Sequence, residues 1–243
     1  MHIDTRPINH RYEFKYVVDD HLARIILEYV RRVALKKSDV QHGEYSVTSL
    51  YFDTPTLHDY YAKLGGFSHR KKLRARIYQG RFTEGDDPVW LEVKEKHDMN
   101  IFKKRALVSR DAWNHFLKSK CPIQSGIFTQ SRELNDFCFR YVREIYAPHI
   151  VVHYTRVVFE GHFLSDIRLT FDRNIETCKW KDYLYNGNYV PVKKNKTVLE
   201  IKFKDALPWW FNDMVTRFHL TRSAFSKYTN SVDAVYKHNP VPR

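Results

Sequence analysis

The stretch KKLRARIY, residues 71–78, alternates charged and apolar side chains with the period of two that is typical of a β-strand. Arg74 and Arg76 fall on one face of this strand, whereas Leu73 and Ile77 fall on the other. The stretch therefore predicts a strand with one face for a hydrophobic core and one face that carries positive charge.

Three more segments alternate in the same way: RYEFKYVV (11–18), WLEVKEK (90–96) and VLEIKFK (198–204). The last two share the pattern L-E-V/I-K-x-K. Further strands are predicted at 45–52, 101–109, 149–160 and 166–175. Because short turns such as GRFTEGDDP join consecutive segments, the eight strands are expected to be mostly antiparallel.

Helical periodicity is found between and after these strands. Residues 19–37 begin at a capping aspartate, keep their apolar side chains on one stripe, and end on lysines that suit the helix dipole. Trp209, Trp210 and Phe211 follow a proline at helical spacing and are expected to anchor their helix in the core. The other predicted helices cover residues 110–120, 130–144, 207–219 and 223–237.

These elements predict an α+β fold, in which the helices pack on the apolar faces of the strands. Eight such strands can close into an antiparallel β-barrel, a tunnel with the helices on the outside and the charged faces inside. The alternative is an open sheet with one wet, charged face. We expect one domain over residues 1–243, with a core at about 8–237.

The chain carries 41 lysines and arginines against 28 acidic residues, a formal net charge of +13. This excess implies an anionic partner: nucleic acid, membrane phosphate, or a phosphorylated small molecule or polymer. If the barrel closes, uncompensated cations in its interior cost several kcal/mol each, so the interior must be wet and bind a highly charged anion. A chain of phosphates meets that need.

Composition excludes other classes. A 43% hydrophobic content excludes a wholly disordered basic tail. The cysteines, Cys121, Cys138 and Cys178, have no CxxC spacing, so neither a zinc knuckle nor a disulfide framework is predicted. No stretch reaches the roughly 20 apolar residues of a membrane span, and the first residues lack a signal-peptide run. We expect a cytoplasmic protein. The alternative is that a separate membrane-protein partner holds it at a membrane.

Seven motifs occur in one order along the chain. This series resembles that of the VTC domain, a branch of the triphosphate tunnel metalloenzymes, whose relatives include CYTH-type triphosphatases and adenylate cyclases. The similarity extends from about residue 8 to 237. The motifs are RYEFKYVV, SLYFDTP (49–55), LRARIY (73–78), LEVKEK (91–96), TFDRNI (170–175), LEIKF (199–203) and FSKYTNSV (225–232).

The resemblance implies a tunnel that binds triphosphate or polyphosphate with a divalent metal, Mn²⁺ or Mg²⁺. In the VTC branch it implies a polyphosphate polymerase that moves the γ-phosphate of ATP onto a growing chain. The phosphate-binding, catalytic cations implied by motif position are Lys15, Arg74, Arg76, Lys94, Arg156 and Lys227. Further substrate-binding candidates are Arg11, Lys103, Arg105, Lys202 and the hydroxyl of Ser226.

Carboxylates are the ligands expected for the metal. Glu200 is the first candidate by motif position, and Glu13, Glu92 and Asp172 are possible helpers. The alternative for these three helpers is an ion pair with a neighbouring cation. Two positions depart from the family patterns: Arg11 replaces the first acid of the superfamily's E-x-E-x-K strand, and Ala224 replaces a lysine, for which Arg222 is a possible substitute.

Phosphoryl transfer requires positioning, charge neutralisation and a metal, all of which this set of residues offers. Two other functions remain open on the same fold: a triphosphatase or polyphosphatase, and a non-catalytic polyphosphate sensor. A nucleic-acid-binding module is disfavoured, because the cations alternate with acids and no RRM-like motif occurs. There is no GxxxxGKS/T, GxGxxG or HExxH motif, and no two histidines have convincing ligand spacing.

Overall fold

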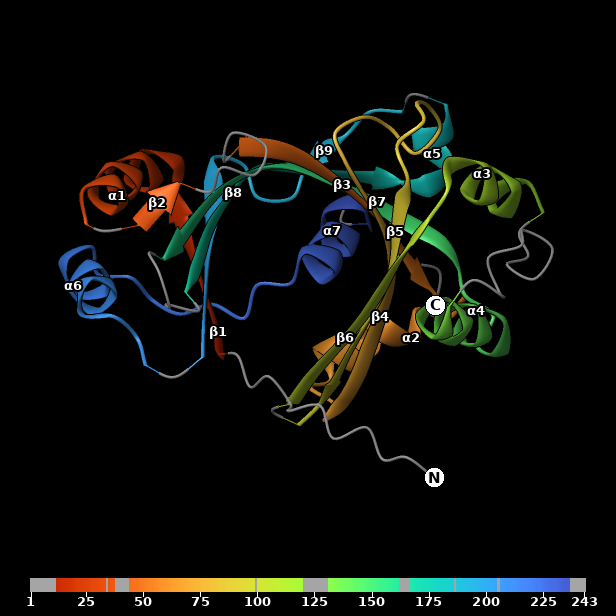
Figure 1. The fold of residues 1–243 in the computed structure, drawn as a ribbon, viewed down its shortest axis with the longest axis horizontal. Helices are drawn as coiled ribbons and strands as arrows, with labels where there is room; N and C mark the ends of the chain where they lie inside the picture. The colour runs from red at the N-terminus through yellow and green to blue at the C-terminus, as the bar shows by residue number, and fades with distance from the viewer. Residues whose placement is uncertain are drawn as a thin grey trace. The chain divides into compact units, whose positions relative to one another are not determined.

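The fold is α+β, and all eight predicted strands are present (Figure 1). A computed structural model describes residues 12–33, 35–37, 44–98, 100–119, 131–161, 167–185, 187–204 and 206–236. The predicted strands correspond to β1 (Tyr12–Asp19), β3 (Glu44–Asp53), β4 (His69–Tyr78), β5 (Val89–His97), β6 (Asn100–Val108), β7 (Ala147–Gly161), β8 (Arg168–Lys179) and β10 (Lys196–Phe203).

Hydrogen bonding joins these strands in the order β1-β10-β8-β7-β3-β4-β5-β6. The pairs β1·β10, β10·β8, β3·β4, β4·β5 and β5·β6 are antiparallel, as the short turns predicted. Two short strands were not predicted: β2 (Leu35–Lys37), which pairs with β7, and β9 (Val190–Pro191), which pairs with β8.

The five predicted helices are present, and two short helices, α2 and α5, were not predicted. Two helix boundaries were wrong: the first helix ends at Arg32 instead of continuing to residue 37, and the last begins at Lys227 instead of at residue 223. Residues 35–37 pair with β7, and these strand hydrogen bonds override the local helical pattern. The helices are α1 (Asp20–Arg32), α2 (His58–Leu64), α3 (Arg110–Ser119), α4 (Arg132–Arg143), α5 (Trp180–Leu184), α6 (Trp209–Arg217) and α7 (Lys227–Tyr236).

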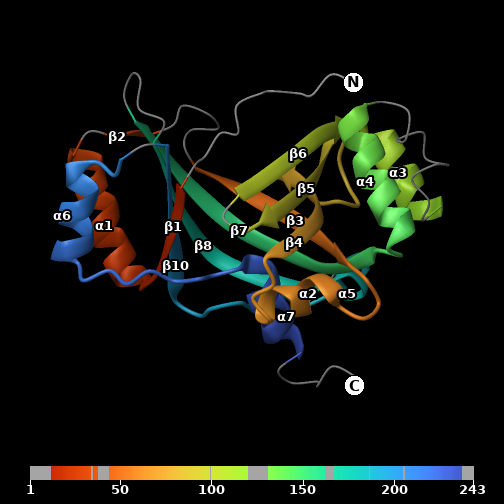
Figure 2. The same ribbon diagram turned by 90° about the horizontal axis from the view of Figure 1, so that it is seen from below.

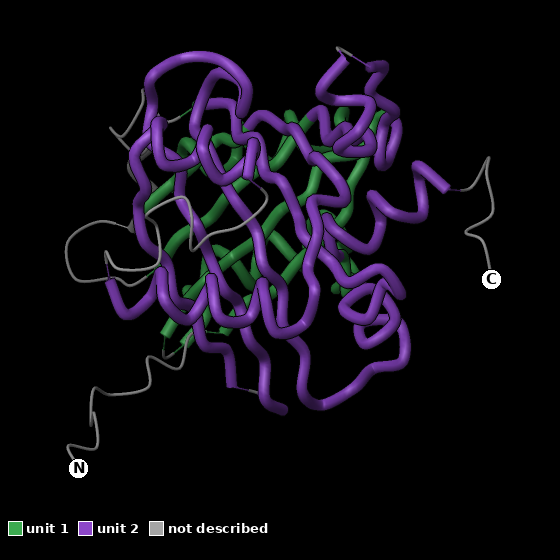
Figure 3. Tube along the Cα trace, turned by 90° about the vertical axis from the view of Figure 1, so that its right-hand side faces the viewer, with its two compact units in different colours: residues 1–44, 156–173, 195–225 green, residues 45–155, 174–194, 226–243 purple. Residues whose placement is uncertain are grey.

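Two compact units divide the chain (Figure 3). Unit 1 consists of residues 1–44, 156–173 and 195–225, and unit 2 consists of residues 45–155, 174–194 and 226–243. Each unit is assembled from three separate segments, so neither is a continuous stretch of sequence. The assignment of one functional domain to the whole chain stays a prediction.

In unit 1, the apolar faces of β1 and β10 pack with α1 and α6. Ile26 and Val30 of α1 are fully buried, as are Leu199 and Ile201 of β10. The alternation that predicted these strands therefore separates a buried face from a charged one.

The core role expected for the aromatic run of α6 holds only in part. Trp210 and Phe211 are buried, but Trp209 is 74% exposed. Trp209 begins the helix and lies one turn before Asp213, on the polar side, whereas Phe211 and Met214 are three residues apart on the buried side. The prediction for Trp209 was wrong because the buried stripe of α6 starts one residue later.

In unit 2, β4, β5 and β6 lie beside α3 and α4 (Figure 2). Leu73 and Ala75 of β4 and Leu91 and Val93 of β5 are buried in the same cluster as the aromatic side chains of these helices. We call this side of the three strands the helix-covered face and the opposite side, with the even-numbered residues of β4 and β5, the charged face.

Two of the three cysteines, Cys138 and Cys178, lie in the described residues, and both are buried free thiols. Among the described helices, none combines the length and the apolar character needed to cross a membrane.

Candidate functional site

In unit 1, two lysines and two carboxylates alternate on neighbouring strands β1 and β10. Lys15 lies opposite Glu200, and Glu13 lies opposite Lys202. Lys15 Nζ is 2.8 Å from Glu13 Oε1 and 3.4 Å from Glu200 Oε2. Lys202 Nζ is 2.8 Å from Glu200 Oε1 and 3.7 Å from Glu13 Oε2. Each carboxylate therefore contacts both lysines.

The environment of Lys15 keeps this residue charged. Burial alone would lower the pKa of Lys15, but the carboxylates of Glu200 and Glu13 outweigh burial and raise its pKa above the ordinary value. The Lys15 ammonium also donates to the carbonyl oxygen of Phe225, at 3.4 Å. These contacts fix the position of the Lys15 ammonium within unit 1.

Arg156 and Asp172 form a two-pronged ion pair between β7 and β8. Arg156 Nε donates to Asp172 Oδ1 at 2.6 Å, and Nη2 donates to Oδ2 at 2.8 Å. Asp172 is fully buried. The alternative predicted for Asp172, a cross-strand salt bridge, is confirmed, and it fixes the plane of the Arg156 guanidinium.

In unit 2, Glu92 on the charged face of β5 gathers cations from both neighbouring strands. Arg74 of β4 lies directly opposite and donates through Nε to Glu92 Oε2. Lys103 of β6 places Nζ 2.7 Å from Glu92 Oε1. Burial would raise the pKa of Glu92, but Arg74, Arg76 and Lys103 outweigh it and hold the pKa well below the usual range. Glu92 is therefore ionised.

The cations around Glu92 also act on one another. Burial and the neighbouring charge of Arg74 lower the pKa of Lys103 to about 8, despite its contact with Glu92. Among Arg74, Arg76 and Lys103, Lys103 is therefore the cation whose pKa lies nearest to neutral pH.

Arg76 lies two residues beyond Arg74 on the same face and is buried. Its Nε donates to Ser49 Oγ at 3.2 Å, and Nη2 donates to the hydroxyl of Tyr154 at 3.4 Å. The Tyr51 hydroxyl accepts from Arg74 at 3.4 Å. Burial would raise the pKa of Tyr51, but Arg74 and Arg76 lower it.

Sequence reasoning did not select Ser49, Tyr51 or Tyr154. Ser49 lies opposite Arg76 and Tyr51 lies opposite Arg74 on β3, so a known register would have placed both on the charged face. Tyr51 also belongs to the motif SLYFDTP, which was the available signal.

Two further predicted residues, Ser226 and Lys227, lie at the start of α7 and contact residues of unit 2. Lys227 Nζ lies 4.7 Å from the ring centre of Tyr154. Ser226 Oγ accepts a hydrogen bond from Lys72 Nζ at 2.7 Å. Lys72 was not among the predicted site residues, although it lies on the same face as Arg74.

Lys94 lies between two other lysines on the charged face, opposite Lys72 of β4 on one side and Lys103 of β6 on the other. Arg105 packs its guanidinium 4.7 Å from the ring centre of Trp90. Arg11 lies outside the described residues. Arg222 of unit 1 packs 3.3 Å from the ring centre of Phe14.

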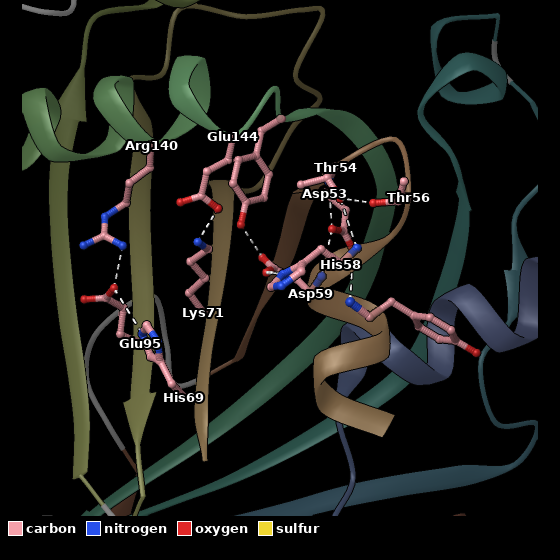
Figure 4. A network of polar contacts seen from close by, with 12 residues as sticks. Asp53, Thr54, Thr56, His58, Asp59, His69, Lys71, Glu95, Arg140 and Glu144 are labelled. Carbon is pink, nitrogen blue, oxygen red and sulfur yellow. Dashed lines mark hydrogen bonds and ion pairs between the residues drawn. The ribbon is translucent and has the colours of Figure 1, made fainter. Parts of the chain in front are cut away.

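Asp53, the aspartate of the FDTP motif, organises the segment around α2 (Figure 4). Its Oδ1 accepts from the backbone N–H groups of Thr54 at 2.7 Å and Asp59 at 3.0 Å. Its Oδ2 accepts from the N–H of Tyr60 at 3.1 Å and from the hydroxyl of Tyr228. Asp53 thus ties α2 to the first turn of α7, which carries Lys227.

Comparisons with known proteins bear on the fold and on the family. No curated protein matches the sequence. Among solved structures, the chain is similar to a candidate adenylate cyclase from Bacillus halodurans, with a TM-score of 0.55 and 11% identity over 89% of this chain and 95% of that chain. It is also similar to a candidate adenylyl cyclase from Hippeastrum, with a TM-score of 0.53 and 14% identity over 92% and 95% of the two chains. At these identities the similarity shows the fold.

The family assignment comes from a family model. The model of the VTC domain matches residues 10–236, nearly the whole chain, and confirms the resemblance found in the motif series. This protein therefore belongs to the VTC domain family.

Proposed function

We propose that this protein binds triphosphate or polyphosphate and transfers phosphoryl groups, as a polyphosphate polymerase that moves the γ-phosphate of ATP onto a growing chain. One observation carries the proposal: three cations, Arg74, Arg76 and Lys103, act on the single carboxylate of Glu92. This excess of positive charge around one buried carboxylate favours an anionic ligand, and a row of phosphates supplies one charge or more per unit.

Arg76 is the clearest phosphate ligand of the group. It is buried, and its side-chain partners among the described residues are two hydroxyls, those of Ser49 and Tyr154. A guanidinium has five N–H donors, so donors remain for a phosphate oxygen. The planar fork suits two oxygens of one phosphate, which a lysine cannot match.

We assign the divalent metal, Mn²⁺ or Mg²⁺, to Glu200 with Glu13. Both are carboxylates on the charged side of unit 1, and their charge is shared with two lysines, Lys15 and Lys202, instead of with arginines. Mg²⁺ typically uses one or two carboxylates together with phosphate oxygens, so these residues fit the ion. Glu92 suits it less well, because three cations, Arg74, Arg76 and Lys103, act on this one carboxylate.

In the proposed reaction, a terminal oxygen of the polyphosphate chain attacks the γ-phosphorus of ATP, the bond to the β-phosphate oxygen breaks, and ADP leaves. The attacking oxygen is already ionised near neutral pH, so no general base is needed. A divalent metal supplies charge neutralisation when it is bound. Arg74, Arg76 and Lys227 of unit 2 would hold the phosphates in line. The phosphate-binding role of Arg156, in unit 1, stays a prediction. The roles of Lys15, Lys94, Lys202 and Ser226 stay predictions of the same kind.

Hydrolysis of triphosphate is the second candidate. The observation that favours it is the similarity to the Hippeastrum structure, which is described as having a dominant triphosphatase activity. Water would then replace the chain end as the nucleophile, with the same cations neutralising the phosphates. A cytoplasmic location and a membrane-protein partner stay predictions.

Product analysis tests the proposal directly. The purified protein is incubated with γ-labelled ATP and Mn²⁺ or Mg²⁺, with and without a short polyphosphate primer, and the products are separated by gel and by phosphate release. Label in long chains supports the polymerase, and label in free phosphate supports the triphosphatase. If neither product forms across divalent metals while polyphosphate binds tightly, the protein is a sensor.

A further inference from the structure

The cluster of His69, Glu95 and His97 lies apart from the phosphate-binding residues. The ligand atoms of these three side chains all lie within 4.8 Å of one another. His69 and His97 are directly opposite each other on β4 and β5, and Glu95 is two residues before His97 on the same strand. Residues two apart in a strand share a face, so all three side chains are on the helix-covered face.

We propose that these residues form a binding site for a zinc-class divalent cation. Two imidazoles and one carboxylate are the donor set that Zn²⁺, Ni²⁺ and Cu²⁺ prefer, whereas Mg²⁺ prefers oxygen ligands alone. The site therefore takes a different metal from the one assigned to Glu200, and it lies on the opposite face of β4 and β5 from Arg74.

The distances fit a bridging ion better than a direct contact. His69 Nε2 is 3.9 Å from Glu95 Oε1, beyond the reach of a hydrogen bond. With ligand bonds of about 2.0–2.2 Å, one zinc ion spans two ligand atoms that are roughly 3.3–4.2 Å apart. The three ligand atoms lie within 4.8 Å of one another, so a rotation of the exposed imidazoles would be needed to bring all three within that range.

Neighbouring residues position the ligands (Figure 4). Arg140 of α4 donates through Nη1 to Glu95 Oε1 at 2.5 Å, which holds the mostly buried carboxylate in place. The His97 ring stacks on His69 with centroids 3.9 Å apart and meets the edge of Phe102 at 5.9 Å. The imidazole of His69 is 54% exposed, so an ion reaches it from solvent.

Zinc titration without nucleotide or phosphate tests the proposal, read by calorimetry and by the visible absorption of tetrahedral Co²⁺. The test variants are His69→Ala, His97→Ala and the double variant. The control is His115→Ala, an exposed histidine of α3 in the same unit. The full-length protein is used throughout, and thermal unfolding verifies that each variant is folded.

The proposal predicts that each single variant weakens Zn²⁺ binding at least about 10-fold. The double variant should bind one equivalent of Zn²⁺ less than the wild type, and His115→Ala should bind Zn²⁺ as the wild type does. Millimolar Mg²⁺ should leave the Zn²⁺ site filled. Equal binding by the wild type and the double variant, or displacement of Zn²⁺ by Mg²⁺, would overturn it. If a histidine-to-alanine variant fails to fold, His69→Gln and His97→Gln give the same comparison with less change in volume.

Discussion

Lys15 of β1 and Glu200 of β10 lie directly opposite each other, with Lys15 Nζ 3.4 Å from Glu200 Oε2. The other oxygen of Glu200 contacts Lys202 at 2.8 Å, and Lys15 also contacts Glu13 at 2.8 Å. Because each lysine keeps a second carboxylate, removing the charge of Glu200 leaves neither lysine without an acidic neighbour. The proposed role of Glu200 in metal binding can therefore be tested separately from its role in the fold.

Glu200→Gln should lower the rate of phosphoryl transfer on the order of 100-fold or more, because the amide is a poor metal ligand and the negative charge is lost. Polyphosphate binding without metal should stay within a few-fold of the wild type. Activity is measured with Mn²⁺ and ATP, and stability by thermal unfolding. Glu28→Gln, on the exposed side of α1, is the matched control. Loss of the folded state in Glu200→Gln would instead assign Glu200 a structural role.

Arg74 and Arg76 should differ in their effect on stability, although both are proposed to bind phosphate. Arg74→Gln leaves buried Glu92 with Lys103 as its nearest cation, so it should cost about 3–5 kcal/mol of unfolding free energy. Arg76→Gln removes a buried charge whose partners are hydroxyls, so stability should be unchanged or higher. Both should weaken triphosphate binding about 10-fold or more and reduce its salt dependence.

Urea unfolding and calorimetric binding check the two arginine variants, with exposed Arg132→Gln of α4 as the control. Equal losses of stability at Arg74 and Arg76 would contradict the different partners assigned to them. Unchanged triphosphate binding in Arg76→Gln would remove the central support for the proposed function.

The pH dependence of triphosphate binding should report on Lys103. Its pKa is lowered to about 8 by burial and by Arg74, so Lys103 is charged below pH 8 and loses its charge above it. Affinity should therefore be constant below about pH 8 and fall as the pH rises through this value. Lys103→Arg stays charged and should abolish the decline.

The same titration affects stability with a defined sign. The unfolded chain binds this proton up to about pH 10.5, whereas the folded protein releases it near pH 8. Between these values the unfolded state binds more protons, so the Lys103 contribution to stability rises with pH. A binding profile that is the same for the wild type and Lys103→Arg would exclude Lys103 from the phosphate site.

The strands could be predicted from the sequence, because charged and apolar side chains alternate along them, as in Leu73, Arg74, Ala75 and Arg76. The contacts between strands could not, since they depend on register. Arg74, Glu92 and Lys103 come from three strands, and only the observed pairing brings them together. His69 and His97 are 28 positions apart, and this spacing alone does not indicate a metal site.

Two errors at the level of elements have the same kind of cause. Residues 35–37 follow a helical pattern but gain strand hydrogen bonds with β7. Trp209 follows a proline at the helix start, and a hydrophobic side chain there does not reveal which way the first turn faces. In both cases the deciding interaction is with a segment distant in sequence, which local periodicity does not contain.

Asp53 should be essential for stability and not for chemistry. It is buried and accepts from three backbone N–H groups and the hydroxyl of Tyr228, so Asp53→Asn exchanges an acceptor oxygen for a donor amide that faces donors. The expected loss is about 1–3 kcal/mol of unfolding free energy, measured by urea unfolding. Exposed Asp86→Asn, in the loop before β5, should be neutral.

At a temperature where the Asp53 variant is fully folded, its phosphoryl-transfer rate should stay within a few-fold of the wild type, because Asp53 acts by joining α2 to α7. A large loss of rate in the folded variant, with stability intact, would show that Asp53 contacts the substrate.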